Sequence, residues 1–154
     1  MSELWAKKLF GEYEINLDDK GRFTVPPEFR EGLGDSFVLT RGPDQVALMI
    51  PMAVWAPIEQ DLYGPTVKIS SRLLQRLFAF RQELHPDTRS RLMLPKTLQD
   101  WMGVEGDQQA VLLGMGSIVE IWTRSNWIEY QRNFSYENVI EAAESLGITQ
   151  AFRL

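Results

Sequence analysis

With 154 residues, the chain is long enough for one ordinary domain or for two small halves that share a core. Its hydrophobic content of 44%, with five Trp and eight Phe, excludes a disordered chain. The net charge of −5 argues at first against a nucleic-acid partner.

Several classes of site lack their residues in this sequence. No apolar run approaches the roughly eighteen residues of a membrane span, and the first ten residues lack the apolar core of a signal peptide. The absence of Cys excludes disulfides and thiolate metal sites, and a single histidine, His85, is too few for most hydrolytic triads and zinc centres. No lysine follows Gly32-Leu33-Gly34, as a phosphate loop would require. We therefore expect a cytoplasmic protein that is not an enzyme and has no metal, cofactor or membrane partner.

The charge is unevenly distributed. Residues 1–65 carry six Lys/Arg against eleven Asp/Glu, and residues 97–154 carry three against eight. Residues 66–96 carry seven against two. This basic middle is either an anion-binding surface or a surface that docks against acidic parts of the same or a neighbouring chain.

The first predicted element is a strand, because apolar and polar residues alternate from Tyr13 to Leu17. The DDKG at 18–21 predicts a turn, since Asp tolerates turn geometry and Gly21 supplies a positive φ. The RFTV at 22–25 is then expected to form the return strand of a hairpin.

Helix and strand signals alternate over the next residues. Pro26-Pro27 stops strand pairing and starts a short helix at PEFREGL, because proline suits a first helical turn. FVLTR and VALMI predict a second hairpin around GPD. A helix is then expected from Pro51 to Leu62.

A connecting helix is expected at residues 66–82, with a periodic pattern from about Val67 to Gln82. Its apolar stripe is Ile69, Leu73, Leu77 and Phe80. A second stripe is basic: Lys68, Arg72 and Arg76. Like charges at i, i+4 disfavour an isolated helix, so an anion should compensate them. Phosphate is one candidate, and the other is the acidic last helix of a neighbouring subunit, with Glu137, Glu141 and Glu144.

The LHPDTRSR at 84–91 fits two interpretations. His-Pro-Asp after a Leu- and Arg-rich helix resembles the chaperone-stimulating loop of J-domains. That loop must link two antiparallel helices, whereas strand-like residues and Pro95 follow here. We therefore expect His85-Pro86 to be a kinked entry into a further hairpin, with Asp87 and Arg91 at its turn.

The remaining elements repeat the order of the first half. RLMLP predicts a strand, KTLQDWM a short helix, AVLLG and IVEIW two strands, and residues 125–134 a helix. A last helix is expected from about Tyr136 to Ser145, with Ser135 as its N-cap. Glu120, inside an apolar strand, either faces solvent at an interface between subunits or pairs with an arginine. Three tryptophans are expected in the core rather than stacked on bases: Trp55, Trp122 and Trp127.

The two halves also match residue by residue. The segment from Asp18 to Pro26 lies 69 residues before the segment from Asp87 to Pro95, and aspartate, arginine and proline coincide. Further pairs at this offset are Phe29 with Leu98 and Leu33 with Met102. After a four-residue insertion in the second copy, Val38 matches Val111 and Trp55 matches Trp127.

Two strand–turn–strand copies, each with Asp-x-x-x-Arg at its first turn, resemble the MraZ family of the AbrB-like, swapped-hairpin class. The resemblance covers roughly residues 11–134 and rests on NLDDKGRFTVPPEFRE, FVLTRG, IVEIW and SRLLQRLFAF. It implies a mostly β fold with peripheral helices (α+β), in which tandem AbrB-like double-psi or swapped-hairpin barrel halves form one unit. The expected parts are repeat 1 (12–55), a connecting helix (66–82), repeat 2 (83–127) and a C-terminal helical segment (128–154).

The chain departs from the family pattern in three places. About ten residues precede GEYE, more than the family usually has. The second turn carries Ser90 where the family usually has glycine, which leaves open whether that turn matches the first. The C-terminal tail carries no family signature.

The resemblance also implies a function. It is that of a transcriptional regulator, a repressor or an activator, of the division and cell-wall gene cluster. Such a protein is nucleoid-associated, assembles into ring-like homo-oligomers and binds repeated G-rich boxes of double-stranded DNA. The family's DNA-contacting region maps to Lys20, Gly21, Arg22, Arg89 and Arg91, with Asp18 and Asp87 bracing the turns.

Arginine suits this task because its planar fork can contact two guanine acceptors at once or grip a phosphate. The simpler interpretation of each motif is an exposed Asp–Arg pair that stabilises a turn and nothing more. Two copies with an additional cation in each favour DNA contact. The alternatives are an antitoxin-like protein and a structural ring without a direct DNA role.

Overall fold

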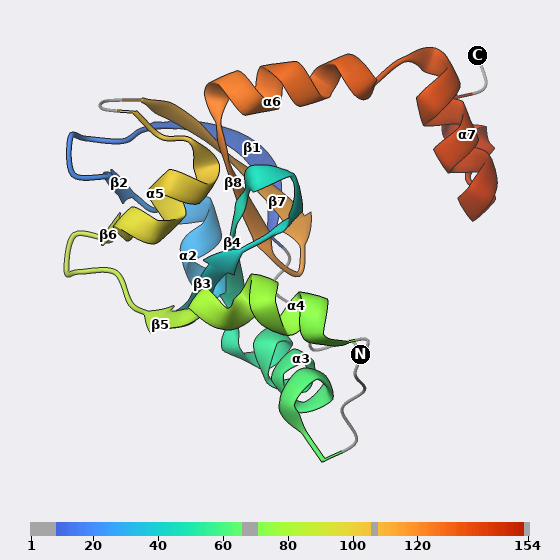
Figure 1. Cartoon of the computed structure of the whole chain (residues 1–154). Helices are drawn as coiled ribbons and strands as arrows, with labels where there is room; N and C mark the ends of the chain where they lie inside the picture. The colour runs from blue at the N-terminus through green and yellow to red at the C-terminus, as the bar shows by residue number, and fades with distance from the viewer. Residues whose placement is uncertain (1–8, 66–70, 106–107, 153–154) are drawn as a thin grey trace. The chain divides into compact units, whose positions relative to one another are not determined.

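The computed structural model describes residues 9–65, 71–105 and 108–152 (Figure 1). The chain forms two compact units, residues 1–124 and residues 125–154. The described strands all lie in the first unit: β1 (Leu9–Asn16), β2 (Arg22–Thr24), β3 (Phe37–Arg41), β4 (Ala47–Pro51), β5 (Gln82–Leu84), β6 (Arg91–Met93), β7 (Gln109–Gly116) and β8 (Val119–Thr123). The described α-helices are α2 (Pro27–Leu33), α3 (Met52–Tyr63), α4 (Arg72–Leu77), α5 (Lys96–Met102), α6 (Arg124–Tyr130) and α7 (Tyr136–Leu146). Short 3₁₀ segments are η1 (Pro43–Gln45), η3 (Phe78–Phe80), η4 (Gln131–Asn133) and η5 (Thr149–Phe152).

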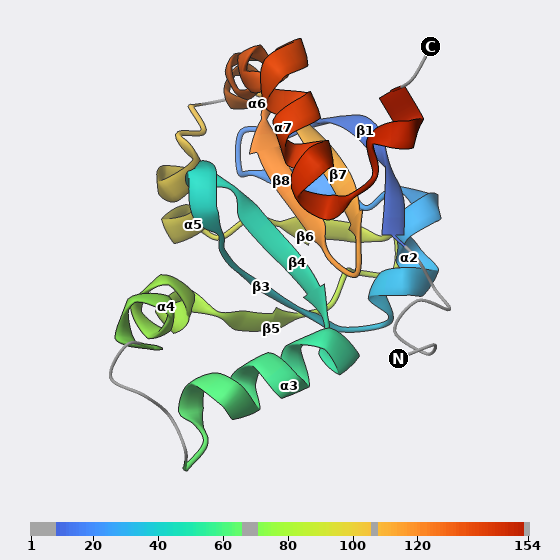
Figure 2. The ribbon, with the colours of Figure 1, turned by 90° about the vertical axis from the view of Figure 1, so that its right-hand side faces the viewer.

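The strands of the first unit pair antiparallel in two groups. Six of them form one sheet in the order β1-β7-β8-β4-β3-β5, and β2 and β6 form a separate two-stranded ribbon. Figure 2 shows β8, β4, β3 and β5 lying side by side across this sheet. Antiparallel strands with peripheral helices confirm the expected α+β class.

The first strand of each half pairs with the other half of the chain. β1 pairs with β7, from Leu9 opposite Gly116 to Asn16 opposite Gln109. β5 pairs with β3, and β2 pairs with β6. The prediction that residues 22–25 return along residues 13–17 as a hairpin was therefore wrong, and so was the hairpin predicted around Asp87. The turn residues determine where the chain reverses, but not which strand it then pairs with.

The strand registers reproduce the sequence repeat. In the ribbon, Phe23 lies directly opposite Leu92, which is its match at the 69-residue offset. Where β4 pairs with β8, Leu48 lies opposite Glu120, at the 72-residue offset that also separates Trp55 from Trp127. Equivalent residues face each other in both pairings, as a pseudo-twofold axis through the two pairs requires.

Residues that match in the repeat meet in one core. Phe29 of α2 and Leu98 of α5 are both fully buried, and so are Leu33 and Met102 one turn further along these helices. Phe29 also packs edge-on against Tyr13 of β1, with 5.0 Å between the ring centroids. The two short helices thus cover the sheet with the same face, as their sequence match predicts.

The connecting helix ends earlier than expected. Its described part is α4 followed by η3, and Gln82, expected at its end, instead begins β5 and lies opposite Leu39. The β-ladder at this sheet edge overrides the helical periodicity. Of the predicted apolar stripe, Leu73 is 75% exposed, whereas Phe80 packs against the core. Residues Lys68 and Ile69 lie outside the described ranges.

The tryptophans named above are buried, which confirms core packing as their interpretation. Trp55 has no exposed surface, and its Nε1 donates to Glu59 at 3.0 Å. Trp122 donates from Nε1 to Oε1 of Glu120, also at 3.0 Å. The carboxylate of Glu120 thus has a hydrogen-bond donor next to it on the same strand, a partner that the sequence did not indicate.

The second unit is helical. Ser135 caps α7, because its hydroxyl accepts a hydrogen bond from the backbone N–H of Asn138 at 3.1 Å, as the sequence predicts. Trp127, Tyr130 and Phe134 form an aromatic cluster with centroid distances of 5.9–6.3 Å. Within the described ranges, no helix combines the length and the apolar character needed to traverse a bilayer.

Candidate nucleic-acid interface

One carboxylate closes the first Asp-x-x-x-Arg turn. Oδ1 of Asp18 accepts hydrogen bonds from the backbone N–H groups of Lys20 (2.9 Å) and Arg22 (2.8 Å), and Oδ2 accepts from Nε of Arg22 at 2.6 Å. The backbone N–H of Gly21 donates to the carbonyl of Asp18 at 3.0 Å. Asp18 therefore fixes both the backbone of the turn and the side chain of Arg22.

The second turn has the same set of bonds. Oδ1 of Asp87 accepts from the backbone N–H groups of Arg89 and Arg91, and Oδ2 accepts from Nε of Arg91, each at 2.9 Å. The N–H of Ser90 donates to the carbonyl of Asp87 at 2.9 Å. Ser90 adopts a φ of 61°, close to the 82° of Gly21. The serine therefore leaves the form of the turn unchanged and takes up the left-handed conformation itself.

The ribbon joins the two turns. Val25 donates to the carbonyl of Ser90 at 2.8 Å, and Leu94 donates to the carbonyl of Gly21 at 2.9 Å. Along each strand the central residue is buried and its two neighbours are exposed. Exposed on one face of the ribbon are Arg22, Thr24, Arg91 and Met93, and buried beneath it are Phe23 and Leu92.

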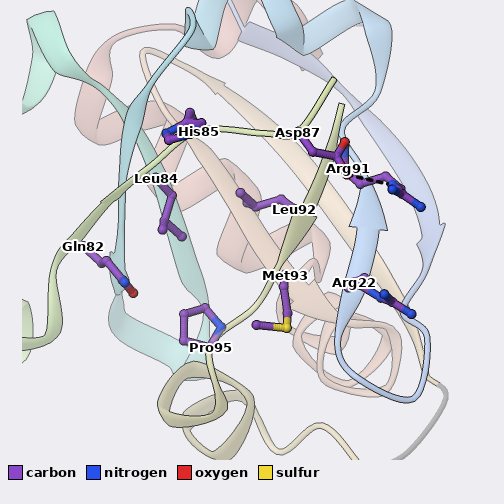
Figure 3. Close-up of a pocket in the computed structure, with 9 residues that line it drawn as sticks. All are labelled: Arg22, Gln82, Leu84, His85, Asp87, Arg91, Leu92, Met93 and Pro95. Atoms are coloured by element: carbon purple, nitrogen blue, oxygen red, sulfur yellow. Dashed lines mark hydrogen bonds and ion pairs between the residues drawn. The ribbon is translucent and has the colours of Figure 1, made fainter. Parts of the chain in front are cut away.

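Both arginines extend from the ribbon to the same side, as Figure 3 shows. Each uses Nε for its aspartate, and the two Nη groups of each fork have no partner among the residues that the structure describes. The arginine side chains are each 47% exposed. They border a hollow of about 460 Å³ together with His85 and Met93. Two preoriented guanidinium forks on one narrow ribbon can donate hydrogen bonds to guanine edges or to phosphates.

Two residues that support the turns were not found from the sequence. Nε2 of Gln99 donates to the carbonyls of Leu94 (2.6 Å) and Lys20 (3.2 Å), which ties α5 to the first turn. Arg30, its equivalent at the 69-residue offset, donates from Nε to the carbonyl of Val25 at 3.0 Å. Their spacing in the repeat is the signal that could have identified them.

The remaining cations fall into two groups. Lys20 and Arg89 are exposed at equivalent positions of the two turns, and neither side chain has an ion-pair partner in the described part of the chain. On α4, the carbonyl of Arg76 accepts a hydrogen bond at 2.8 Å from Arg41, a cap for the C-terminus of this helix. Among residues 9–65, 71–105 and 108–152, no carboxylate forms an ion pair with Arg72 or Arg76, and both arginines lie outside the ribbon.

Comparison with known proteins identifies the family. The family model described as MraZ protein, with a suggested antitoxin-like character, matches residues 9–77 and again residues 77–147. The chain belongs to the MraZ family. Proteins named transcriptional regulator MraZ are similar over most of their length: that of Syntrophomonas wolfei is 37% identical over 142 residues, covering 90% of this chain and 98% of the relative. Those of Moorella thermoacetica and Herpetosiphon aurantiacus are 39% and 40% identical, over 85% and 82% of this chain and 93% and 89% of the relatives.

The bracing carboxylates of this MraZ-family chain are held in their charged form. The backbone hydrogen bond from Arg22 is the main cause that lowers the pKa of Asp18 below its ordinary value, and the backbone hydrogen bond from Arg91 does the same for the pKa of Asp87. The hydrogen bond with the carboxylate of Asp18 in turn raises the pKa of the Arg22 guanidinium. Each turn is therefore an ion pair throughout the neutral pH range.

The lowered pKa of Asp18 predicts how stability depends on pH. A carboxylate with a lower pKa in the folded state stabilises the fold above its unfolded pKa of about 3.9 and loses this contribution as the pH falls through the folded value. Asp18→Asn should therefore melt below the unmodified protein at pH 7, and this difference should shrink below about pH 4. Thermal melts of both proteins across this range test the prediction. A difference that does not change with pH would contradict it.

Ser90→Gly should stabilise the protein. A residue with a Cβ in the left-handed region lowers stability by roughly 1–2 kcal/mol. Glycine avoids this cost, but it lowers stability by roughly 0.4–1 kcal/mol because it raises the conformational entropy of the unfolded chain. We expect a net gain of about 1 kcal/mol, which raises the Tm by about 2–4 °C. The opposite exchange at the equivalent position of the first turn, Gly21→Ser, should lower the Tm, because the Cβ of the serine would overlap Nε2 of Gln99. Equal Tm values for Ser90→Gly and the unmodified protein would contradict the assigned turn.

Proposed function

We propose that this chain is a sequence-specific transcriptional regulator that binds double-stranded DNA through the β2–β6 ribbon. The observation that carries the proposal is the pair of equivalent turns whose arginines extend to one side of a single ribbon. A two-stranded ribbon fits the major groove, where an arginine fork can bond O6 and N7 of guanine. The names of the MraZ relatives support the same class of function.

The turn residues have distinct roles in this proposal. Arg22 and Arg91 contact base edges. Lys20 and Arg89, which are exposed within the two turns, contact phosphates, and lysine does so as a point charge. Gly21 contacts the DNA through its backbone, in the left-handed conformation that glycine adopts readily. Asp18 and Asp87 hold the arginines and do not touch DNA, since a carboxylate would be repelled by phosphate.

We further propose that binding is multivalent. One chain carries a net charge of −5 and few cations at the ribbon, so its own affinity for DNA should be poor. A ring-shaped homo-oligomer that engages repeated G-rich boxes gains effective concentration at the second and later boxes. Such boxes upstream of the division and cell-wall gene cluster would make this a cytoplasmic, nucleoid-associated regulator of that cluster.

Footprinting of the purified protein on the DNA upstream of its own gene tests the proposal. The expected result is protection of spaced, G-rich repeats, with affinity that falls when one box is deleted or the spacing is changed. Equal binding to any DNA would leave only a non-specific role. No binding to DNA would favour the alternatives, an antitoxin-like protein or a structural ring.

A further inference from the structure

The exposed face of the ribbon contains one asymmetric pair. Arg22 lies across from Met93 at one end of the ribbon, and Arg91 lies across from Thr24 at the other. The 69-residue offset relates Arg22 to Arg91 and Thr24 to Met93. The four exposed residues are therefore symmetric in their arginines and differ in having methionine where the other half has threonine.

The side chain of Met93 is accessible to a ligand at the ribbon. Its side chain is 52% exposed, whereas Leu92 and Leu94 on either side are buried. It borders the same hollow as Arg22 and Arg91. Any ligand that engages both arginines must therefore cover this apolar side chain as well.

The thioether side chain of Met93 limits which bases can contact it. Cross-strand neighbours have Cβ atoms roughly 4.5–5.5 Å apart, and successive base pairs are separated by roughly 3.4 Å. A guanine held by Arg22 thus places a neighbouring base pair within reach of Met93. The thioether is only a weak acceptor and donates no hydrogen bond, so it leaves polar base edges unpaired. Thymine, with its C5-methyl group in the major groove, is the base that offers an apolar contact.

We propose that Met93 is a specificity-determining residue that contacts the C5-methyl of a thymine beside the guanine bound by Arg22. This inference rests on the proposed DNA-binding function. Thr24 carries a hydroxyl that can hydrogen-bond to several base edges. The two halves of the ribbon therefore have different base requirements, and each subunit binds its site with a defined polarity.

Selection of binding sites from a random DNA library, followed by sequencing, tests this role. The full-length protein should select guanines with a thymine at one neighbouring position. Met93→Gln should replace that thymine by adenine, because glutamine can bond N6 and N7 of adenine, and should leave the guanines unchanged. Replacing the selected thymine by uracil removes only the methyl group. It should weaken binding of the unmodified protein about fourfold and leave Met93→Gln unaffected.

Met115→Gln is the matched control, because Met115 is 53% exposed in β7 and lies outside the ribbon. It should keep the thymine and its sensitivity to uracil. If Met93→Gln melts early, Met93→Ser replaces it, and this variant should lose the thymine preference because serine has no methyl group to contact that of thymine. Guanine selection with an unchanged thymine in the Met93 variants would overturn the inference alone. No sequence selection by the unmodified protein would overturn the proposed function and the inference with it.

Discussion

Arg22→Ala and Arg91→Ala should each weaken binding to a single DNA box by about five- to hundredfold, the effect of losing one bidentate base contact. Each subunit of a multivalent assembly loses the same contact, so the loss on DNA with several boxes should be larger. The preference for guanine at the contacted position should relax as well. Mobility-shift titrations with matched and mutated boxes measure both effects.

Measurements of thermal stability distinguish a DNA-contacting role of these arginines from a purely structural one. Both arginine side chains are about half exposed, and their removal opens no cavity, so the Tm should change little. Arg124→Ala is the matched control, since its side chain is 49% exposed and lies 3.6 Å from Glu14. Normal DNA binding by both ribbon variants, together with a lower Tm, would make the motif a turn brace. The DNA-contacting surface would then have to be sought on α4, with Arg72 and Arg76.

Of the substitutions considered, Phe29→Ala should cause the largest loss in the free energy of unfolding. Phe29 is fully buried under the sheet and packs against Tyr13, so truncation leaves a cavity that the short helix α2 cannot fill. The expected cost is about 3–5 kcal/mol, against a total stability of roughly 5–15 kcal/mol for a typical domain. The Tm should fall by about 6–20 °C, as measured by calorimetry.

Phe10→Ala provides the comparison for Phe29. The Phe10 side chain is 57% exposed on β1, so its truncation should change the free energy of unfolding by no more than about 0.5 kcal/mol. A loss for Phe29→Ala as small as that for Phe10→Ala would show that α2 does not hold the core as described.

The sequence alone determined the local features of this protein. The repeat at 69 residues predicts both turns, both short helices and the equivalence of Arg22 and Arg91. These features could be predicted because turn chemistry, helix starts and apolar periodicity depend on residues close together in the chain. The N-cap at Ser135 and the burial of the tryptophans follow from the same local rules.

The local sequence pattern did not decide which strands pair, and the tertiary structure did. Strand β2 could pair with its neighbour β1 as a hairpin or with a strand of the other half. Both pairings satisfy the same number of backbone hydrogen bonds, so the sequence of residues 13–25 permits both. The difference is made by burial: pairing β2 with β6 places Phe23 and Leu92 together over the core. The same exchange brings the two arginines onto one ribbon. It also ends the connecting helix before Gln82, because β5 is needed at the sheet edge beside β3.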